Sequence, residues 1–296
     1  MDTEQADREH LDPPGVRRLR CDVGEVALVR EEPLVIEVWA GPAPDATGAA
    51  RSGPVDSVLT MRTPGDDEDL ALGFLLSEGV LARVDDVARL EALSRAADDS
   101  PYPVDVVRVT LRPDRLPGPL ERERLTRAHA VRASCGLCGR ASPAGLTAGL
   151  RPLPPGRSMT SLPRLGAMAE AMRAAQAVFS RTGGSHAAGV FDADSGEPWA
   201  VREDVGRHNA LDKALGRCAR DGRDLSRAAI VLSGRGGFEL VLKALRLGAP
   251  VVASVSAPST LAVDLAVERG LTLVGFLRGG AGTVYADDGR LAPGCR

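Results

Sequence analysis

Two cysteines near the middle of the chain, Cys135 and Cys138, have the spacing and the neighbours of a reactive thiol pair. Gly136 and Gly139 follow them directly, which allows positive φ angles and leaves the sulfur atoms uncovered. Arginines flank the pair on both sides, and nothing around it has the apolar pattern of a buried core. We therefore expect an exposed loop that carries nucleophilic sulfur.

A Cys-x-x-Cys pair can serve several kinds of chemistry, and the sequence argues against a metal site. A structural zinc site needs four ligands, usually two such pairs, and the other three cysteines are isolated. A zinc deaminase needs His-x-Glu ahead of its cysteines, whereas His186 follows them and Ala188 stands where the glutamate would be. Thioredoxin-type redox chemistry needs the pair at the start of a helix, which this glycine-rich stretch favours poorly. Sulfur carriage as a persulfide needs an accessible thiolate; residue chemistry alone does not separate it from redox work.

Composition sets the class of protein. A chain of 296 residues with 44% apolar residues has room for one large or two ordinary globular domains. The net charge of −3 argues against a general nucleic-acid binder. The N-terminus is polar, no apolar run has the length of a membrane span, and the five cysteines are few and odd in number. These features predict a cytoplasmic protein without a disulfide framework.

The second half of the chain alternates strands and helices. Strands are predicted at 187–191, 198–203, 229–233, 251–255 and 271–277, and helices at 162–181, 206–220, 238–247 and 259–269. Uninterrupted apolar strands joined by helices indicate a parallel sheet that is covered on both faces. The fold class is therefore α/β.

The first half lacks this regular alternation of strands and helices. Residues 1–20 read as a disordered tail, strands are predicted within 21–39 and at 55–62 and 104–111, and a helix runs from the Thr63–Asp67 turn to Gly79. The proline-rich stretch 150–156 is the clearest linker. We expect a smaller mixed α+β domain at 21–156 and a second domain at 157–296.

The predicted parallel sheet places three polar segments at one edge, because ligands bind outside the carboxyl ends of parallel strands. These segments are 233–237, 254–259 and 276–280. Two precede helix N-termini, which favour anions, and Arg235 and Arg278 suit contacts to phosphate. A phosphate or pyrophosphate ligand is expected there. The roles of His186, His208 and Asn209 stay open between ligand contact and structural hydrogen bonding.

Several ordered blocks of the sequence resemble the formate dehydrogenase accessory sulfurtransferase family (FdhD). The similarity extends from about Val26 to Tyr285. The blocks are Met61-Arg62-Thr63-Pro64-Gly65, Leu70-Ala71-Leu72-Gly73-Phe74-Leu75, Glu78-Gly79, Ser134–Gly139, Thr182–His186, Glu203–Lys213, Leu232–Arg235, Ser256–Ser259 and Leu273–Gly279. So many blocks in one order make chance similarity an inadequate explanation.

The resemblance implies a function and a fold. Members take sulfur from a cysteine desulfurase as a persulfide and transfer it to the bis-molybdopterin guanine dinucleotide form of the molybdenum cofactor, which formate dehydrogenase requires. It also implies a homodimer and a three-layer, cytidine-deaminase-like C-terminal domain without zinc. A guanine nucleotide such as GDP is expected to occupy the same site. No nucleic acid or membrane partner is implied.

By position, the resemblance makes Cys135 the persulfide carrier and Cys138 the supporting thiol. The expected cofactor-binding residues are Phe276, Leu277, Arg278, Gly279, Gly280, Ala281, Ser233, Gly234, Arg235, His186 and Asn209. Ala281-Gly282-Thr283 stands where the family often has Arg-Phe-Asn, so a basic contact of the family is missing at that end. The alternative function is a cofactor-binding chaperone that transfers no sulfur and uses its cysteine pair as a redox sensor.

Overall fold

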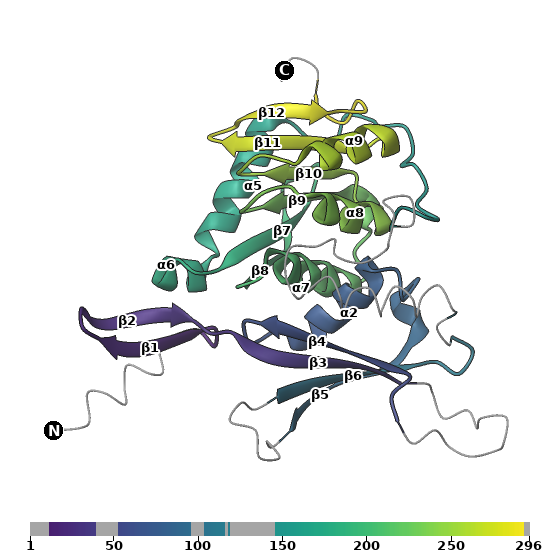
Figure 1. Ribbon diagram of the computed structural model, residues 1–296. Coiled ribbons are helices and arrows are strands. Elements are labelled where there is room, and N and C mark those ends of the chain that lie inside the picture. The colour runs from purple at the N-terminus through teal and green to yellow at the C-terminus, as the bar shows by residue number, and fades with distance from the viewer. Residues whose placement is uncertain (1–11, 40–52, 96–103, 116–117, 119–145, 293–296) are drawn as a thin grey trace.

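The computed structural model describes residues 12–39, 53–95, 104–115, 118 and 146–292 (Figure 1). Cys135 and Cys138 lie outside the described residues. The described chain forms two larger sheets and one hairpin, with helices between and around them. Within these ranges, none of the helices has both the length and the apolar character that a membrane crossing requires.

The N-terminal part is built on a four-stranded sheet in the order β4 (Asp56–Arg62), β3 (Glu32–Trp39), β6 (Val104–Leu111), β5 (Val87–Arg95). The two central strands are parallel and both outer pairs are antiparallel. The predicted strands at 55–62 and 104–111 are confirmed, and β5, which follows the short 3-10 helix Val84–Asp86, was not predicted.

Helix α2 (Asp67–Ser77) covers one face of this sheet and is confirmed close to its predicted bounds. Leu70, Phe74 and Leu75 are fully buried against Leu34 and Ile36 of β3. The opposite side of α2 packs on the C-terminal part of the chain (Figure 1), so almost the whole helix is buried. This explains why α2 is apolar nearly all round instead of along one stripe.

A hairpin of β1 (Val16–Cys21) and β2 (Gly24–Val29) precedes the sheet and packs against α6 (Ala177–Thr182). Residues 16–20 were predicted to belong to a disordered tail, and that prediction is wrong for them. Their arginine-rich sequence has the polarity of a tail, but pairing with β2 satisfies the backbone, and Val16 is buried.

The C-terminal part is built on a six-stranded sheet. Its order is β12 (Ala281–Ala286), β11 (Thr272–Arg278), β10 (Val251–Ser254), β9 (Ala228–Leu232), β7 (His186–Asp192), β8 (Pro198–Asp204). Strands β9, β10 and β11 are parallel, as predicted, while β7, β8 and β12 run antiparallel to their neighbours. Strand β12 was not predicted.

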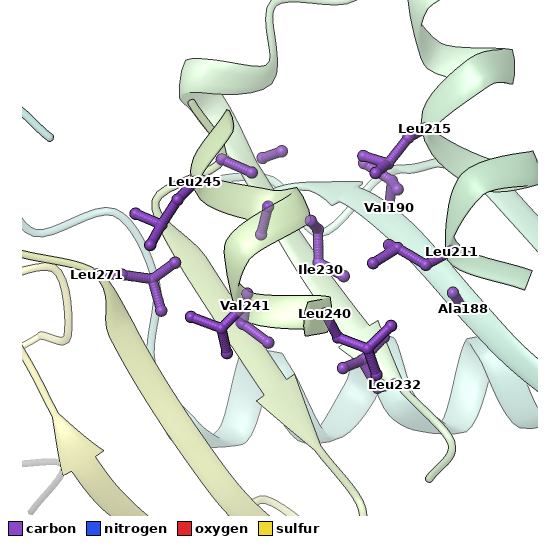
Figure 2. Close-up of a cluster of buried hydrophobic side chains, with 14 of the residues drawn as sticks. Ala188, Val190, Leu211, Leu215, Ile230, Leu232, Leu240, Val241, Leu245 and Leu271 are labelled. Atoms are coloured by element: carbon purple, nitrogen blue, oxygen red, sulfur yellow. The ribbon is translucent and has the colours of Figure 1, made fainter. Parts of the chain in front are cut away.

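Helices cover both faces of this sheet, as the sequence predicted. On one face lie α7 (Arg207–Arg220), α8 (Phe238–Arg246) and α9 (Thr260–Arg269), whose buried side chains form one core cluster with Ile230 and Val252. Figure 2 shows part of this cluster, with Leu240 and Val241 of α8 beside the sheet. On the other face, α5 (Leu162–Ala174) packs on alternate residues of the same strands.

The single helix predicted at 162–181 is in fact two helices, α5 and α6, separated at Ala175 and Gln176. The reason is the carboxylate of Glu203 on β8. It accepts hydrogen bonds from the backbone N–H groups of Val178 and Phe179, both at 2.8 Å, and so satisfies the start of a new helix. A long-range partner of this kind leaves no trace in the local sequence.

Candidate functional site

The carboxyl ends of β9, β10 and β11 lie side by side, and the loops that follow them are joined by backbone hydrogen bonds. The N–H of Ser259 donates to the carbonyl of Gly236 at 3.2 Å, and the N–H of Phe276 donates to the carbonyl of Ser256 at 3.3 Å. The structure thus brings together the three segments that the sequence placed at this edge. We call the edge formed by residues 233–237, 254–259 and 276–280 the strand-end edge.

Next to β9, Ser233 and Gly234 form a close contact with the start of β7. The Oγ of Ser233 accepts a hydrogen bond from the Ala187 N–H at 2.8 Å, and the Ser233 N–H donates to the Ala187 carbonyl at 3.0 Å. The ring of His186 consequently lies against Gly234, where an added Cβ atom would be 3.3 Å from Nδ1. Glycine at 234 therefore leaves room for the imidazole.

Positive charge gathers around His186. Burial lowers the pKa of His186 below its ordinary value of 6.5, and the nearby charges of Arg207, His208 and Arg235 lower it further. A pKa below 6.5 keeps its imidazole mostly neutral at pH 7. Arg207 begins α7, so its charge stands at the positive end of a helix dipole. The arginines thus outweigh the carboxylate of Asp204, which acts in the opposite direction on the pKa of His186.

Two residues beside this cluster were not singled out by the sequence. Arg207 is one of them. The other is Glu239, in the first turn of α8, whose Oε2 lies 2.8 Å from Nε2 of His208. The sequence could have indicated Arg207 and Glu239 as site residues, since each lies in the first turn of a predicted helix next to a candidate loop.

Asn209 has contacts that join the two parts of the chain. Its amide Nδ2 donates to the Met61 carbonyl at 2.7 Å and to Oδ1 of Asp204 at 3.1 Å. Asp204 is fully buried and also accepts hydrogen bonds from the backbone N–H groups of Thr63 and Gly206. Both amide hydrogens of Asn209 are therefore used within the protein, which makes structural hydrogen bonding the better description of this side chain.

Next to β11, the predicted site residues have unequal surroundings. Leu277 is buried in the core under α5. Gly279 and Gly280 have φ angles of 54° and 81° and form the tight turn between β11 and β12, where Arg278 pairs with Ala281. Type I′ turns require this backbone conformation at both central residues, so the two glycines have a structural explanation. Phe276, Arg278 and Ala281 are exposed.

The described residues that flank the cysteine-bearing stretch lie near the C-terminal end of α8, opposite the end that begins at the strand-end edge. Arg115 and Gly118 line an open cleft of about 1060 Å³, together with Val80, Asp86, Arg220 and Arg246. Arg246 also donates a hydrogen bond to the carbonyl of Leu146 at 3.1 Å. Arg246 ends α8, whereas α8 begins at the strand-end edge, so the whole helix separates the two places.

The fold and this edge define a two-part α/β protein whose C-terminal sheet presents Arg235 and Arg278 at its strand-end edge. The chain belongs to the FdhD/NarQ family, whose model matches residues 54–292. It is similar to the "Sulfur carrier protein FdhD" of Streptomyces avermitilis (45% identity; 90% of this chain and 89% of that one) and of Streptomyces coelicolor (47%; 90% and 89%). The protein of that name from Mycobacterium tuberculosis is 43% identical over 89% and 91% of the two chains.

A solved structure has the same fold. It is a crystal structure described as that of a candidate formate dehydrogenase accessory protein of Desulfotalea psychrophila, with a TM-score of 0.61 and 21% identity. The match covers 94% of this chain and 96% of that one. At this identity the likeness concerns the fold alone.

Proposed function

We propose that this protein is a sulfurtransferase that carries sulfur as a persulfide on Cys135 and transfers it to the bis-molybdopterin guanine dinucleotide form of the molybdenum cofactor, for use by a formate dehydrogenase. The observation that carries the proposal is the similarity, over about 90% of the chain, to proteins named sulfur carriers. The glycine-flanked thiol pair supports it, because sulfur carriage needs an accessible nucleophile.

Loading moves one sulfur atom without a change in its oxidation state. The Cys135 thiolate attacks the outer sulfur of the persulfide on a cysteine desulfurase. The S–S bond of the donor breaks, the donor cysteine leaves as a thiolate, and Cys135 becomes the persulfide. A cytoplasmic location, which remains a prediction, would keep the acceptor thiol reduced.

Delivery is a two-electron step, and the second cysteine supplies the electrons. The Cys138 thiolate attacks the inner sulfur of the Cys135 persulfide, a Cys135–Cys138 disulfide forms, and the outer sulfur leaves as hydrosulfide to the molybdenum of the substrate. A cellular thiol must then reduce the disulfide before the next cycle. This division of labour explains why two thiols at this spacing are useful.

The strand-end edge is the proposed binding surface for the substrate. A guanine dinucleotide carries pyrophosphate groups, and Arg235 and Arg278 supply cations on the edge, with Arg207 near His186 beside it. The cysteine segment re-enters the described chain at Leu146, 11 residues after Cys135. Eleven residues span at most roughly 40 Å when extended, whereas α8 is only about 14 Å long. Chain length therefore does not prevent Cys135 from reaching the edge.

Two finer features remain predictions. One is the assembly of the chain as a homodimer. The other is the cytidine-deaminase-like arrangement of the C-terminal part, for which the mixed sheet with helices on both faces is supporting evidence. Size-exclusion chromatography with light scattering tests the first, and a peak at the mass of a monomer at all concentrations would contradict it.

The deciding experiment is mass spectrometry of the intact protein and its peptides without reductant, after incubation with a cysteine desulfurase and free cysteine. We expect a thiol-reversible gain of one sulfur atom on the Cys135 peptide, absent in Cys135→Ser. Cys21→Ser is the matched control, since Cys21 is exposed but lies outside the pair. No gain on either cysteine of the pair, with GDP binding intact, would favour the cofactor-binding chaperone with a redox-sensing pair.

A further inference from the structure

His208 and Glu239 form a pair between the first turns of two helices. Nε2 of His208, on α7, lies 2.8 Å from Oε2 of Glu239, on α8. The two side chains are 30% and 32% exposed, so each holds the other in place while solvent still reaches both. Because α8 begins directly after the loop 233–237, the pair stands beside the strand-end edge.

Packing does not explain why this pair is present. Helices α7 and α8 already share one core through Leu211, Leu240 and Val241, and a partly exposed ion pair adds little stability. A charged histidine in the first turn of a helix is also unfavourable, because it meets the positive end of the helix dipole. A chemical role accounts for the pair better than a structural one.

The geometry defines which nitrogen of His208 is available for chemistry. A carboxylate only accepts hydrogen bonds, so at 2.8 Å from Glu239 the Nε2 atom keeps its proton. Neutral His208 then has its lone pair on Nδ1, and none of the residues that the structure describes forms a hydrogen bond with that atom. A carboxylate that fixes an imidazole in this way prepares it to take a proton from a nucleophile.

Other charged groups surround the pair. They are His186 at the start of β7, Arg207 on α7, Arg235 in the loop after β9, and Asp204 on β8, all of which interact electrostatically at this corner. Asp204 is itself paired with Lys213 at 2.8 Å. A substitution within the pair therefore changes one imidazole or one carboxylate, while these neighbouring groups stay the same.

We propose that His208 is the general base of the delivery step and that Glu239 is its positioning residue. The inference rests on the proposed function and deepens it, because it assigns the proton transfer that the step requires. Nδ1 of His208 takes the proton of the Cys138 thiol, and the freed electron pair of that sulfur attacks the inner sulfur of the Cys135 persulfide. The persulfide S–S bond breaks as the Cys135–Cys138 disulfide forms. The outer sulfur is reduced by two electrons, takes the proton back from His208 and leaves as hydrosulfide.

The length of the chain allows this approach. Leu146 is eight residues after Cys138, and eight residues span at most roughly 28 Å when extended. The Leu146 carbonyl is bound by Arg246 at the C-terminal end of α8, and Glu239 lies in the first turn of the same helix. Because α8 is only about 14 Å long, the thiol is within reach of the pair.

The test loads the full-length protein with persulfide, removes all other thiols and follows the rate of hydrosulfide release between pH 6 and pH 9.5. His208→Gln keeps a donor that can face Glu239 but has no basic nitrogen. At pH 7 we expect it to be roughly 30-fold slower than wild type, because only about 3% of an ordinary thiol is ionised at that pH. The deficit should shrink to less than about threefold at pH 9.5, where the thiol ionises without a base. Glu239→Gln should lie between the two at pH 7.

Two further variants serve as controls. Asp221→Asn removes a carboxylate just beyond the other end of α7 and should match wild type at every pH. Cys138→Ser should release no hydrosulfide. Both variants of the pair should melt within about 4 °C of wild type, because a partly exposed ion pair adds little stability.

Each outcome decides a different point. Release from His208→Gln at the rate of wild type at pH 7 would overturn the role of the base and leave the proposed function standing. A deficit of the same size at every pH would also overturn it, because the defect would then be one of structure. If wild type takes up no persulfide, or if Cys138→Ser releases hydrosulfide as fast as wild type, the proposed delivery step itself fails, and the role of His208 fails with it.

Discussion

Gly73 of α2 lies so close to Asp212 of α7 that a Cβ atom on Gly73 would be 1.8 Å from the Asp212 carbonyl oxygen. The relationship is reciprocal, since a Cβ atom on Gly216 would be 1.9 Å from the carbonyl oxygen of Asp69. The two helices thus touch backbone to backbone, and they join the N-terminal sheet to the C-terminal sheet.

We expect Gly73→Ala to destabilise the protein by about 3 kcal/mol or more, the upper end for overpacking, because the clashing atoms belong to the backbone. Urea denaturation followed by circular dichroism measures this. Gly53→Ala is the control, since no atom lies within 4 Å of its added Cβ, and it should change the unfolding free energy by less than about 0.5 kcal/mol. Equal effects would contradict the close contact of the helices.

A buried ion pair supports the same contact. Nζ of Lys243 donates to Oδ1 of Asp212 at 3.0 Å and to Oγ of Ser77 at 2.7 Å, with Lys243 only 4% exposed. Lys243→Met should therefore cost about 3–5 kcal/mol, because the Asp212 carboxylate keeps its charge in the interior without its cation.

The matched control is the surface pair of Arg217 and Asp221, which has the same charges in a largely solvated setting. Arg217→Gln should cost less than about 1 kcal/mol. The same urea titration compares both variants. A loss below 1 kcal/mol in Lys243→Met would mean that the Lys243 pair is solvated in the folded protein.

Cys218 should be inert in the folded protein. Burial raises the pKa of its thiol from 9.0 to about 12, which lowers the thiolate fraction at pH 8 by roughly a factor of 1000. Brief iodoacetamide treatment at pH 8 should alkylate the exposed Cys21 and leave Cys218 unmodified until denaturant is added. Peptide mass spectrometry gives both extents, and equal labelling in the native protein would be inconsistent with a buried thiol on α7.

His186 should titrate below pH 6.5, chiefly because of burial and then because of Arg207 and its neighbours. The folded state then binds this proton more weakly than the unfolded state. Its contribution to stability is complete above pH 6.5 and declines as the pH falls below that value. Proton NMR of the imidazole, assigned with His186→Asn, gives the titration midpoint. A midpoint at or above 6.5 would exclude the buried, cation-flanked environment.

Arg278 should matter for nucleotide binding and not for sulfur loading. Removing a charge-assisted contact to phosphate costs about 1.5–3 kcal/mol, so Arg278→Gln should weaken GDP binding by roughly tenfold or more. Calorimetry measures that loss, with Arg217→Gln as the control at a distant surface. Persulfide formation on Cys135 should be unchanged. A variant that binds GDP normally would remove β11 from the proposed contact surface.

The parts of the fold that follow from local patterns were predictable. The apolar runs at 229–233, 251–255 and 271–277 have the composition of buried parallel strands, and the structure confirms all three as β9, β10 and β11. Strand β5 was missed because its sequence, with Leu90 and Leu93 at helical spacing, becomes a strand only through pairing with β6. The glycine-containing β12 is likewise defined by its partner.

For the candidate site, too, some features could be predicted from the sequence and others could not. Convergence at the strand-end edge followed from the topology of parallel strands. The burial of Lys213 did not follow from the sequence. Asn209 and Lys213 are four residues apart on a predicted helix, a spacing that a solvent-exposed pair satisfies equally well. In the structure Lys213 is 1% exposed and donates to Asp204 and to the Thr63 carbonyl, which comes from the other half of the chain. Partners 150 residues away are beyond any local pattern.

The burial of α2 on both sides makes the two halves of the chain one cooperative unit of unfolding. Its inner face completes the core of the N-terminal sheet, while its outer face meets α7 through the paired glycines and the Lys243 ion pair. A fragment cut at the 150–156 linker would therefore expose α2, whose apolar and charged side chains are buried in the whole chain.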